Sequence, residues 1–71
     1  MATRPVLLGT VTAFGVDGLG EVTGVDGVVR PFHCTAISDG SRQVEVGAEV
    51  EFEVVPGRGG RLEARPVVVR G

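Results

Sequence analysis

The tetrapeptide Gly-Val-Asp-Gly occurs twice in this chain, at 15–18 and 24–27, so that the two copies start nine residues apart. The Asp-Gly pair in each copy favours a tight turn that requires a positive φ. The spacing suits one short strand with a turn at each end. It is much shorter than the period of about 20–50 residues that is typical of repeat architectures. The repeated tetrapeptide therefore predicts hairpins of short strands.

A strand with one buried face is predicted most clearly at Glu49–Val55. Here Val50, Phe52 and Val54 alternate with three glutamates, so the apolar side chains share one face and the carboxylates the other. Pro66 restricts the strand that contains it to an edge or a bulge. The other strands are expected at 6–14, about 21–23, about 28–33 and 62 to about 69.

The connections between these strands are polar and rich in glycine. "ISDGSRQ" and "PGRGG" are the longer ones, and "TAISDGS" has room for one turn of 3₁₀ helix. Because no stretch has sustained helical periodicity, five short strands with glycine turns predict a small barrel, closed or partly open. With 71 residues, the chain has room for one domain, expected at 6–69, after a flexible N-terminus at 1–5.

Composition limits the partners and the location. The net charge is −2, and all seven positive charges are arginines. An acidic chain has no overall attraction for nucleic acid, so such binding requires local arginines and stacking. The single cysteine cannot form an internal disulfide, and no apolar run approaches the roughly 20 residues that span a bilayer. The first residues are too short an apolar stretch for a signal peptide, so we expect a cytoplasmic protein with no membrane association.

Other chemistry that the glycine-rich stretch suggests lacks the required residues. A phosphate-binding loop needs a helix after the glycines, but Glu21 and the residues after it favour a strand. A calcium loop needs more carboxylates, at alternate positions.

His33 and Cys34 are adjacent in a strand and point to opposite faces, which disfavours a shared metal ion. With one histidine, no catalytic triad can be assembled, so we expect a non-enzyme without cofactor or metal.

The order of these segments resembles that of bacterial cold-shock domains. "GTVTAFGVDGLGEV", "FHCTAI", "VGAEVEFEVVPG" and "GRLEARPV" follow the family's G-x-V-K-W-F, K-G-F-G-F-I, V-F-V-H-F-S-A-I, G-x-x-V-x-F and G-P-x-A segments. The resemblance covers roughly residues 7–67. The matching residues are Gly9, Val11, Phe14, Gly18, Gly20, His33, Thr35, Ala36, Ile37, Gly47, Val50, Phe52, Gly60 and Ala64.

The resemblance implies an all-β, five-stranded antiparallel Greek-key barrel (OB-fold, cold-shock type) that binds single-stranded RNA or DNA on outward aromatic rings. Each base stacked on a ring contributes about 1–3 kcal/mol. In this chain Ala13 stands at the family's tryptophan, Leu19 and Glu21 stand at two of its phenylalanines, and Asp17 stands at a lysine. We therefore expect binding that is weak and has little sequence preference.

The candidate contacts follow from position in the family and from the arginines. Phe32 counts inward from Ala36 and Ile37, but a bulge at Pro31 would turn it outward. His33 is either a base-contacting side chain or an exposed histidine without a role, and the arginines can equally be solvated surface charges. The candidate nucleic-acid contacts are Thr12, Leu19, Arg30, Phe32, His33 and Arg42, and Arg58, Arg61 and Arg65 form a second arginine group.

A second function class stays open. A barrel that has lost nucleic-acid binding could serve as a protein-interaction or regulatory module. Ala13, Leu19 and Pro31 would then form an apolar patch for a protein partner or a homodimer.

Overall fold

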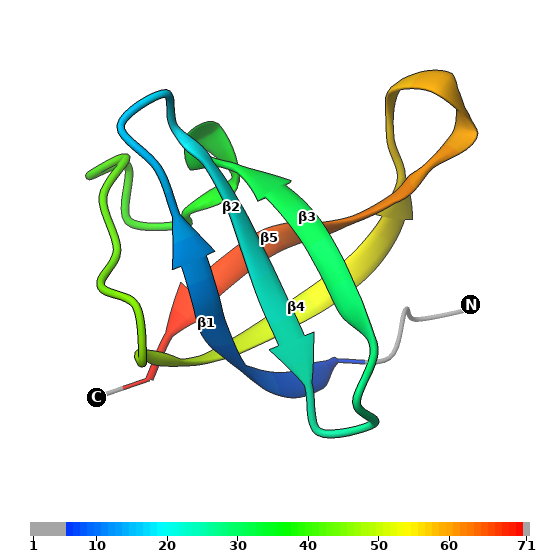
Figure 1. Ribbon diagram of the computed structural model, residues 1–71, viewed down its shortest axis with the longest axis horizontal. Coiled ribbons are helices and arrows are strands. Elements are labelled where there is room, and N and C mark those ends of the chain that lie inside the picture. The colour runs from blue at the N-terminus through cyan, green and yellow to red at the C-terminus, as the bar shows by residue number, and fades with distance from the viewer. Residues whose placement is uncertain (1–5, 71) are drawn as a thin grey trace.

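Five antiparallel strands form one sheet in the computed structural model, which describes residues 6–70 (Figure 1). The sheet order is β3-β2-β1-β4-β5, and single 3₁₀ turns, η1 and η2, follow β3 and β4. The expected all-β class and the strand positions are confirmed, as is the 3₁₀ turn. The flexible segment predicted at 1–5 lies outside the described residues. The elements are β1 Leu7–Phe14, β2 Leu19–Gly24, β3 Val29–His33, η1 Cys34–Ala36, β4 Glu49–Pro56, η2 Arg58–Gly60 and β5 Leu62–Val69.

Both copies of Gly-Val-Asp-Gly form hairpin turns of the same geometry, which confirms the turn interpretation. The last glycine of each copy, Gly18 or Gly27, has φ +82°, a value that a residue with a side chain rarely adopts. The aspartate carboxylate of each copy accepts a hydrogen bond from the amide two residues later, from Leu19 at 3.1 Å and from Val28 at 3.0 Å. Because these bonds are local, the tetrapeptide dictates its own turn.

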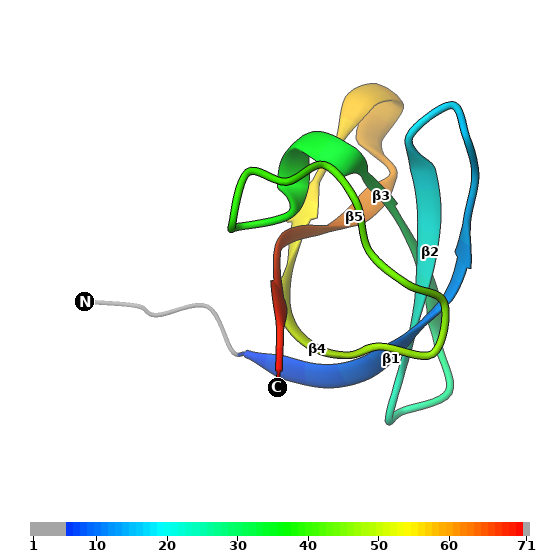
Figure 2. The same cartoon turned by 90° about the vertical axis from the view of Figure 1, so that its left-hand side faces the viewer.

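The sheet curls strongly, so that its two edge strands approach each other (Figure 2). Register shifts occur in β1 between Val11 and Ala13, and in the pairing of β4 with β5 between Phe52 and Val54. Such bulges increase local bending and twist. Pro66 lies at the second of these bulges, in the edge strand β5, as its lack of an amide hydrogen predicts.

The edges do not join into a continuous ladder in the part of the chain that the structure describes. The bridge at this seam is an isolated parallel one between Ile37, just after η1, and Val67 of β5. The amide of Ser38 also donates to the Val67 carbonyl at 2.9 Å. The sheet is thus strongly curled but not closed into a barrel. Within residues 6–70, no helix is long and apolar enough to cross a membrane.

Two phenylalanine rings are completely buried in the interior, and a third is partly buried. Phe52 is 1% exposed, as expected, and Phe32 is 2% exposed. Phe14 is half-buried, and its ring stacks on that of Phe32 with centroids 5.9 Å apart. The alternative in which Phe32 turns outward is wrong, because β3 pairs with β2 without a register shift and Pro31 introduces no bulge. Val11, Val22, Ala36, Ile37, Val50, Ala64 and Val67 complete the buried core.

The buried rings lie directly over glycines of the neighbouring strands. A Cβ atom at Gly20 would come within 2.5 Å of Phe32 Cζ, and one at Gly9 within 2.9 Å of Phe52 Cε1. Both contacts are shorter than side chains tolerate, so the rings occupy the space that side chains at these positions would need. This small core can thus hold large rings because the neighbouring strands have a glycine, with no side chain, opposite each ring.

We predict that Gly20→Ala destabilises the fold by about 1–3 kcal/mol, because the added methyl group overpacks the contact with Phe32. Urea unfolding followed by circular dichroism measures the change. Val25→Ala is the control, since Val25 is 78% exposed at a turn and should change stability by less than about 0.5 kcal/mol. Equal stability of Gly20→Ala and the native chain would show that Phe32 does not pack on Gly20.

Candidate nucleic-acid interface

The outward residues of β1, β2 and β3 form two adjacent rows. Ala13 pairs with Glu21, and Glu21 pairs with Pro31, which gives one row across three strands. Leu19 pairs with His33 in the next row. Leu19 is 56% exposed and Glu21 and His33 are also exposed, so these side chains form the surface of this sheet face, which we call the outer face.

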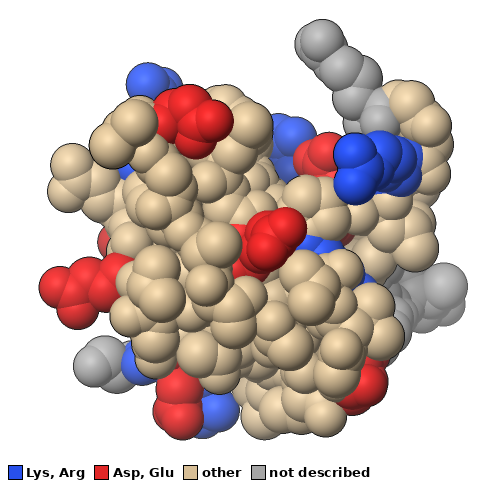
Figure 3. Space-filling view, viewed as in Figure 1, with Lys and Arg blue, Asp and Glu red and all other residues tan. Residues whose placement is uncertain are grey.

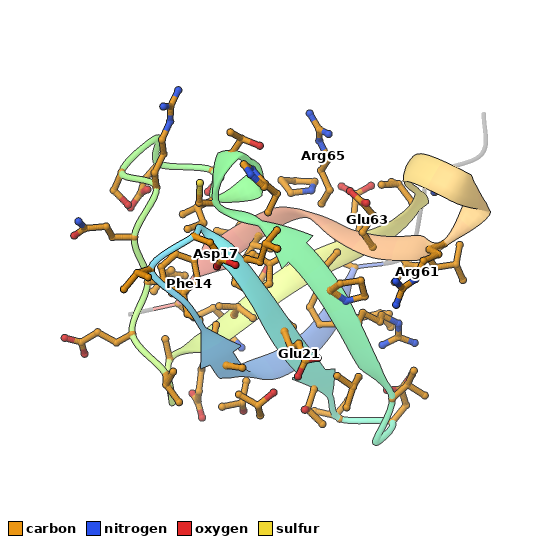
Figure 4. All side chains as sticks on the ribbon, turned by 45° about the horizontal axis from the view of Figure 1, so that its top comes forward. Phe14, Asp17, Glu21, Arg61, Glu63 and Arg65 are labelled. Carbon is orange, nitrogen blue, oxygen red and sulfur yellow. The ribbon has the colours of Figure 1, made fainter. Side chains whose placement is uncertain are left out.

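Residues from the β4–β5 connection and from β5 form a wall beside the outer face. Figure 4 shows Arg61, Glu63 and Arg65 on the segment beyond β3, with Glu21 on β2 at the other side of β3. Two adjoining open hollows lie between them, of about 570 and 780 Å³. Both are lined by Leu19, Pro31 and Glu63, so they form one trough along β3.

The trough carries few charges, and they are of both signs. Glu21 and Arg61 line the smaller hollow, Arg65 and His33 line the larger, and Glu63 lines both. The surface above β2 and β3 is mostly uncharged, with an acidic group near its middle and basic groups toward the β4–β5 connection (Figure 3). Within the described residues, the ion pairs are Arg30–Asp26 and Arg70–Glu51, so the charged groups of the trough remain available to a ligand.

Arg30 does not belong to this face. It alternates with Pro31 along β3 and lies on the inward side, where its guanidinium carbon is 5.6 Å from the centre of the Phe52 ring. Its two terminal nitrogens bond the Asp26 carboxylate at 2.8 and 3.3 Å, and 14% of its side chain is exposed. Arg30 therefore covers one end of the core by a cation–π contact and an ion pair, and the structure does not bring it together with the candidates on the outer face.

The other predicted contacts are divided between the face and its surroundings. Thr12 is exposed at the β1 bulge, where its hydroxyl lies 2.9 Å from that of Thr23. Phe32 lies beneath the trough and, being buried, cannot stack on a base. Arg42 is exposed, with φ +60°, and lines a separate hollow of about 690 Å³ together with Phe14. Of the candidates, the structure brings Leu19 and His33 together in the trough.

His33 is fixed in orientation by the 3₁₀ turn that follows it. The Thr35 amide donates to His33 Nδ1 at 3.3 Å, and the Thr35 hydroxyl lies 3.0 Å from the same nitrogen. With Nδ1 accepting, the ring hydrogen is assigned to Nε2. Cys34 Sγ lies 3.8 Å from Nδ1, but residues 6–70 contain no group of three side chains that could hold a metal ion.

Sequence reasoning did not place Arg61, Glu63 and Arg65 beside the outer face. The two arginines were expected only as part of a second arginine group, apart from the candidate contacts. Their position depends on the curl that brings β5 next to β3, for which local sequence carries no signal. The side chain of Arg58 lies outside the described part of the structure.

A scan against models of known protein families finds no match, and a search of curated proteins finds no similar sequence.

The contact of Asp26 with Arg30 predicts how the stability of the fold depends on pH. The Arg30 hydrogen bonds, and then the Val28 amide, hold the pKa of Asp26 below its usual value of 3.8. Because the folded-state pKa is lowered, the ionised carboxylate stabilises the fold at any pH above the unfolded-state pKa of about 3.9. This contribution to stability is lost as the pH falls through the folded-state pKa. We expect Asp26→Asn to be less stable than the native chain at pH 6, with the gap closing below about pH 4.

Urea midpoints between pH 2 and pH 6 measure this gap. Asp17→Asn is the matched control, since Asp17 occupies the same place in the other turn and bonds no arginine among the described residues. Its stability loss at pH 6 should be the smaller of the two. A gap for Asp26→Asn that is constant with pH would contradict the assignment.

Proposed function

We propose that this chain is a cold-shock-type oligonucleotide-binding barrel of Greek-key topology that binds single-stranded RNA or DNA weakly. The resemblance to cold-shock domains over roughly residues 7–67 supports this proposal, and so does the five-stranded curled antiparallel sheet. The outer face of β1–β3 is the face on which the resemblance places the ligand. The resemblance therefore points to the surface that contains the trough.

The observation that carries the proposal is the open trough along β3. An unstacked nucleic-acid strand needs an extended surface with cations along it and a floor on which bases can lie. Arg61 and Arg65 stand on one wall, and Leu19 and Pro31 form an apolar floor. The guanidinium groups can contact phosphates or stack on bases, which lets arginine replace part of an aromatic platform.

Two features limit the affinity. The chain has three phenylalanines and no tryptophan or tyrosine, and none of the three rings stands exposed on the outer face. The missing stacking removes about 1–3 kcal/mol per base. Glu21 and Glu63 also place negative charge beside the path of the phosphates. The result is a binder whose affinity depends on its few arginines and therefore on salt.

We predict that fluorescent heptamers of single-stranded DNA or RNA bind with a dissociation constant tighter than about 1 mM at low salt, and more weakly as salt rises. Arg65→Ala should weaken binding and flatten the salt dependence by about one phosphate contact, because Arg65 lines the trough. Arg70→Ala is the matched control, since Arg70 pairs with Glu51 and lines neither hollow of the trough. No binding at 1 mM protein would end this proposal.

We also predict that Leu19→Phe tightens binding, because it adds a ring at an exposed position of the trough where the resemblance implies one. At about 1–3 kcal/mol per stacked base, the gain is about fivefold or more. Val68→Phe is the control, since Val68 is 39% exposed on β5 and lies outside the trough. An equal effect of both substitutions would mean that the face of β1–β3 is not the binding surface.

A protein-interaction module is the second candidate, favoured by the exposed apolar floor itself. Leu19 is 56% exposed beside Pro31 and Ala13, and no aromatic ring covers them. If oligonucleotides do not bind and light scattering shows a dimer that Leu19→Asp disrupts, this candidate replaces the first.

A further inference from the structure

Glu21 occupies the middle of the outer face, at a place where a base-stacking side chain is implied by the resemblance. Its strand neighbours on that face are Ala13 and Pro31, both without charge. It makes no ion pair with any described residue. Its backbone carbonyl accepts weakly from the Thr12 hydroxyl at 3.4 Å, whereas no hydrogen bond to its carboxylate is found within residues 6–70. The carboxylate can therefore act as an acceptor for a ligand.

A guanidinium group stands on the other side of the same hollow. Arg61 lines it from the β4–β5 connection, while Glu21 lines it from β2, and β3 with Pro31 lies between them (Figure 4). β2 and β3 are hydrogen-bonded neighbours, whereas the β4–β5 connection lies beyond the free edge of β3, so a ligand that lies over Pro31 has Glu21 on one side and Arg61 on the other. The hollow thus has the Glu21 carboxylate on one side, the Arg61 donors with the Glu63 carboxylate on the other, and an apolar floor.

We infer that this hollow reads one guanine of the bound strand by its edges, an inference that rests on the proposed function. The base lies over Pro31. Glu21 accepts hydrogen bonds from the ring N1–H and the 2-amino group of guanine, and Arg61 donates to its O6 and N7. A bidentate arginine contact to O6 and N7 is a common way of recognising guanine.

The other bases fit this arrangement worse for a chemical reason. A carboxylate presents two acceptors side by side and so matches a ligand with two adjacent donors. Guanine has such a pair on its Watson–Crick edge. Adenine and cytosine place a ring-nitrogen acceptor beside the amino group, and thymine or uracil flanks its single N–H with two carbonyl oxygens. Each of those acceptors would face the Glu21 carboxylate and be repelled.

The test compares heptamers that differ in the central nucleotide. Fluorescence titrations at low salt use thymidine heptamers with thymidine, guanosine, adenosine, cytidine or inosine at the centre. Inosine lacks the 2-amino group and keeps O6 and N7. We expect the guanosine heptamer to bind about fivefold or more tightly than the all-thymidine heptamer, and the inosine heptamer to bind with an affinity between the two, because it lacks only the 2-amino contact to Glu21.

Glu21→Gln removes the charge and one of the two acceptors while keeping the size of the side chain. It should reduce the preference for guanosine to what the Arg61 contact alone gives, and it should leave all-thymidine binding unchanged or tighter, because a negative charge leaves the path of the phosphates. Glu49→Gln is the matched control, since Glu49 is exposed on β4 and lines neither hollow of the trough. It removes the same charge and should keep the preference.

The outcomes separate this inference from the proposed function. If the heptamers bind without a preference for guanosine, or if Glu21→Gln keeps the preference, the guanine site is overturned and nucleic-acid binding stands. If none of the heptamers binds, both are overturned. A circular dichroism spectrum and urea midpoint like those of the native chain confirm that Glu21→Gln is folded.

Discussion

The packing of three phenylalanine rings into a thin core determines what the rest of this molecule can present. A chain of 71 residues buries only roughly 60% of the surface that its unfolded form exposes, so few side chains are available for its interior. Phe52 and Phe32 are buried completely, and Phe14 stacks on Phe32. With no tryptophan or tyrosine in the sequence, the core uses every ring that the chain has, and the outer face is built from Leu19, Pro31 and charged groups instead.

The two Gly-Val-Asp-Gly turns show how the same local structure acquires different roles. Both place a carboxylate over the amide two residues later. Only Asp26 has an arginine four residues further on, and the guanidinium that it holds lies over Phe52. The second turn therefore helps to cover one end of the core. The first turn, which has no such arginine, lines the hollow near Arg42.

Sequence reasoning succeeded where the determining interactions are local. The alternation at Glu49–Val55, the two turns and the bulge at Pro66 depend on residues within a few positions of one another. It did not anticipate that Arg30, a predicted ligand contact, lies inward over the Phe52 ring. It left the direction of Phe32 open, because one bulge in β3 would have reversed the facing of its residues. The trough itself could not be predicted, since its wall of Arg61, Glu63 and Arg65 reaches β3 only through the curl of the whole sheet.

Because none of the three phenylalanine rings stands exposed on the outer face, the proposed site would contact a different part of a base than an aromatic platform does. An aromatic platform binds the π-face, which every base has, and so gives affinity without selectivity. In the proposed site, Glu21 on one side and Arg61 on the other would add contacts at the edge of a base, where donors and acceptors differ between bases. Such an edge contact by Glu21 would contribute less affinity than a stacked ring, because the carboxylate also repels the phosphates. If the proposed function holds, a glutamate in place of a ring at position 21 would lower affinity and raise discrimination, and the two should vary in opposite directions when that one position is changed.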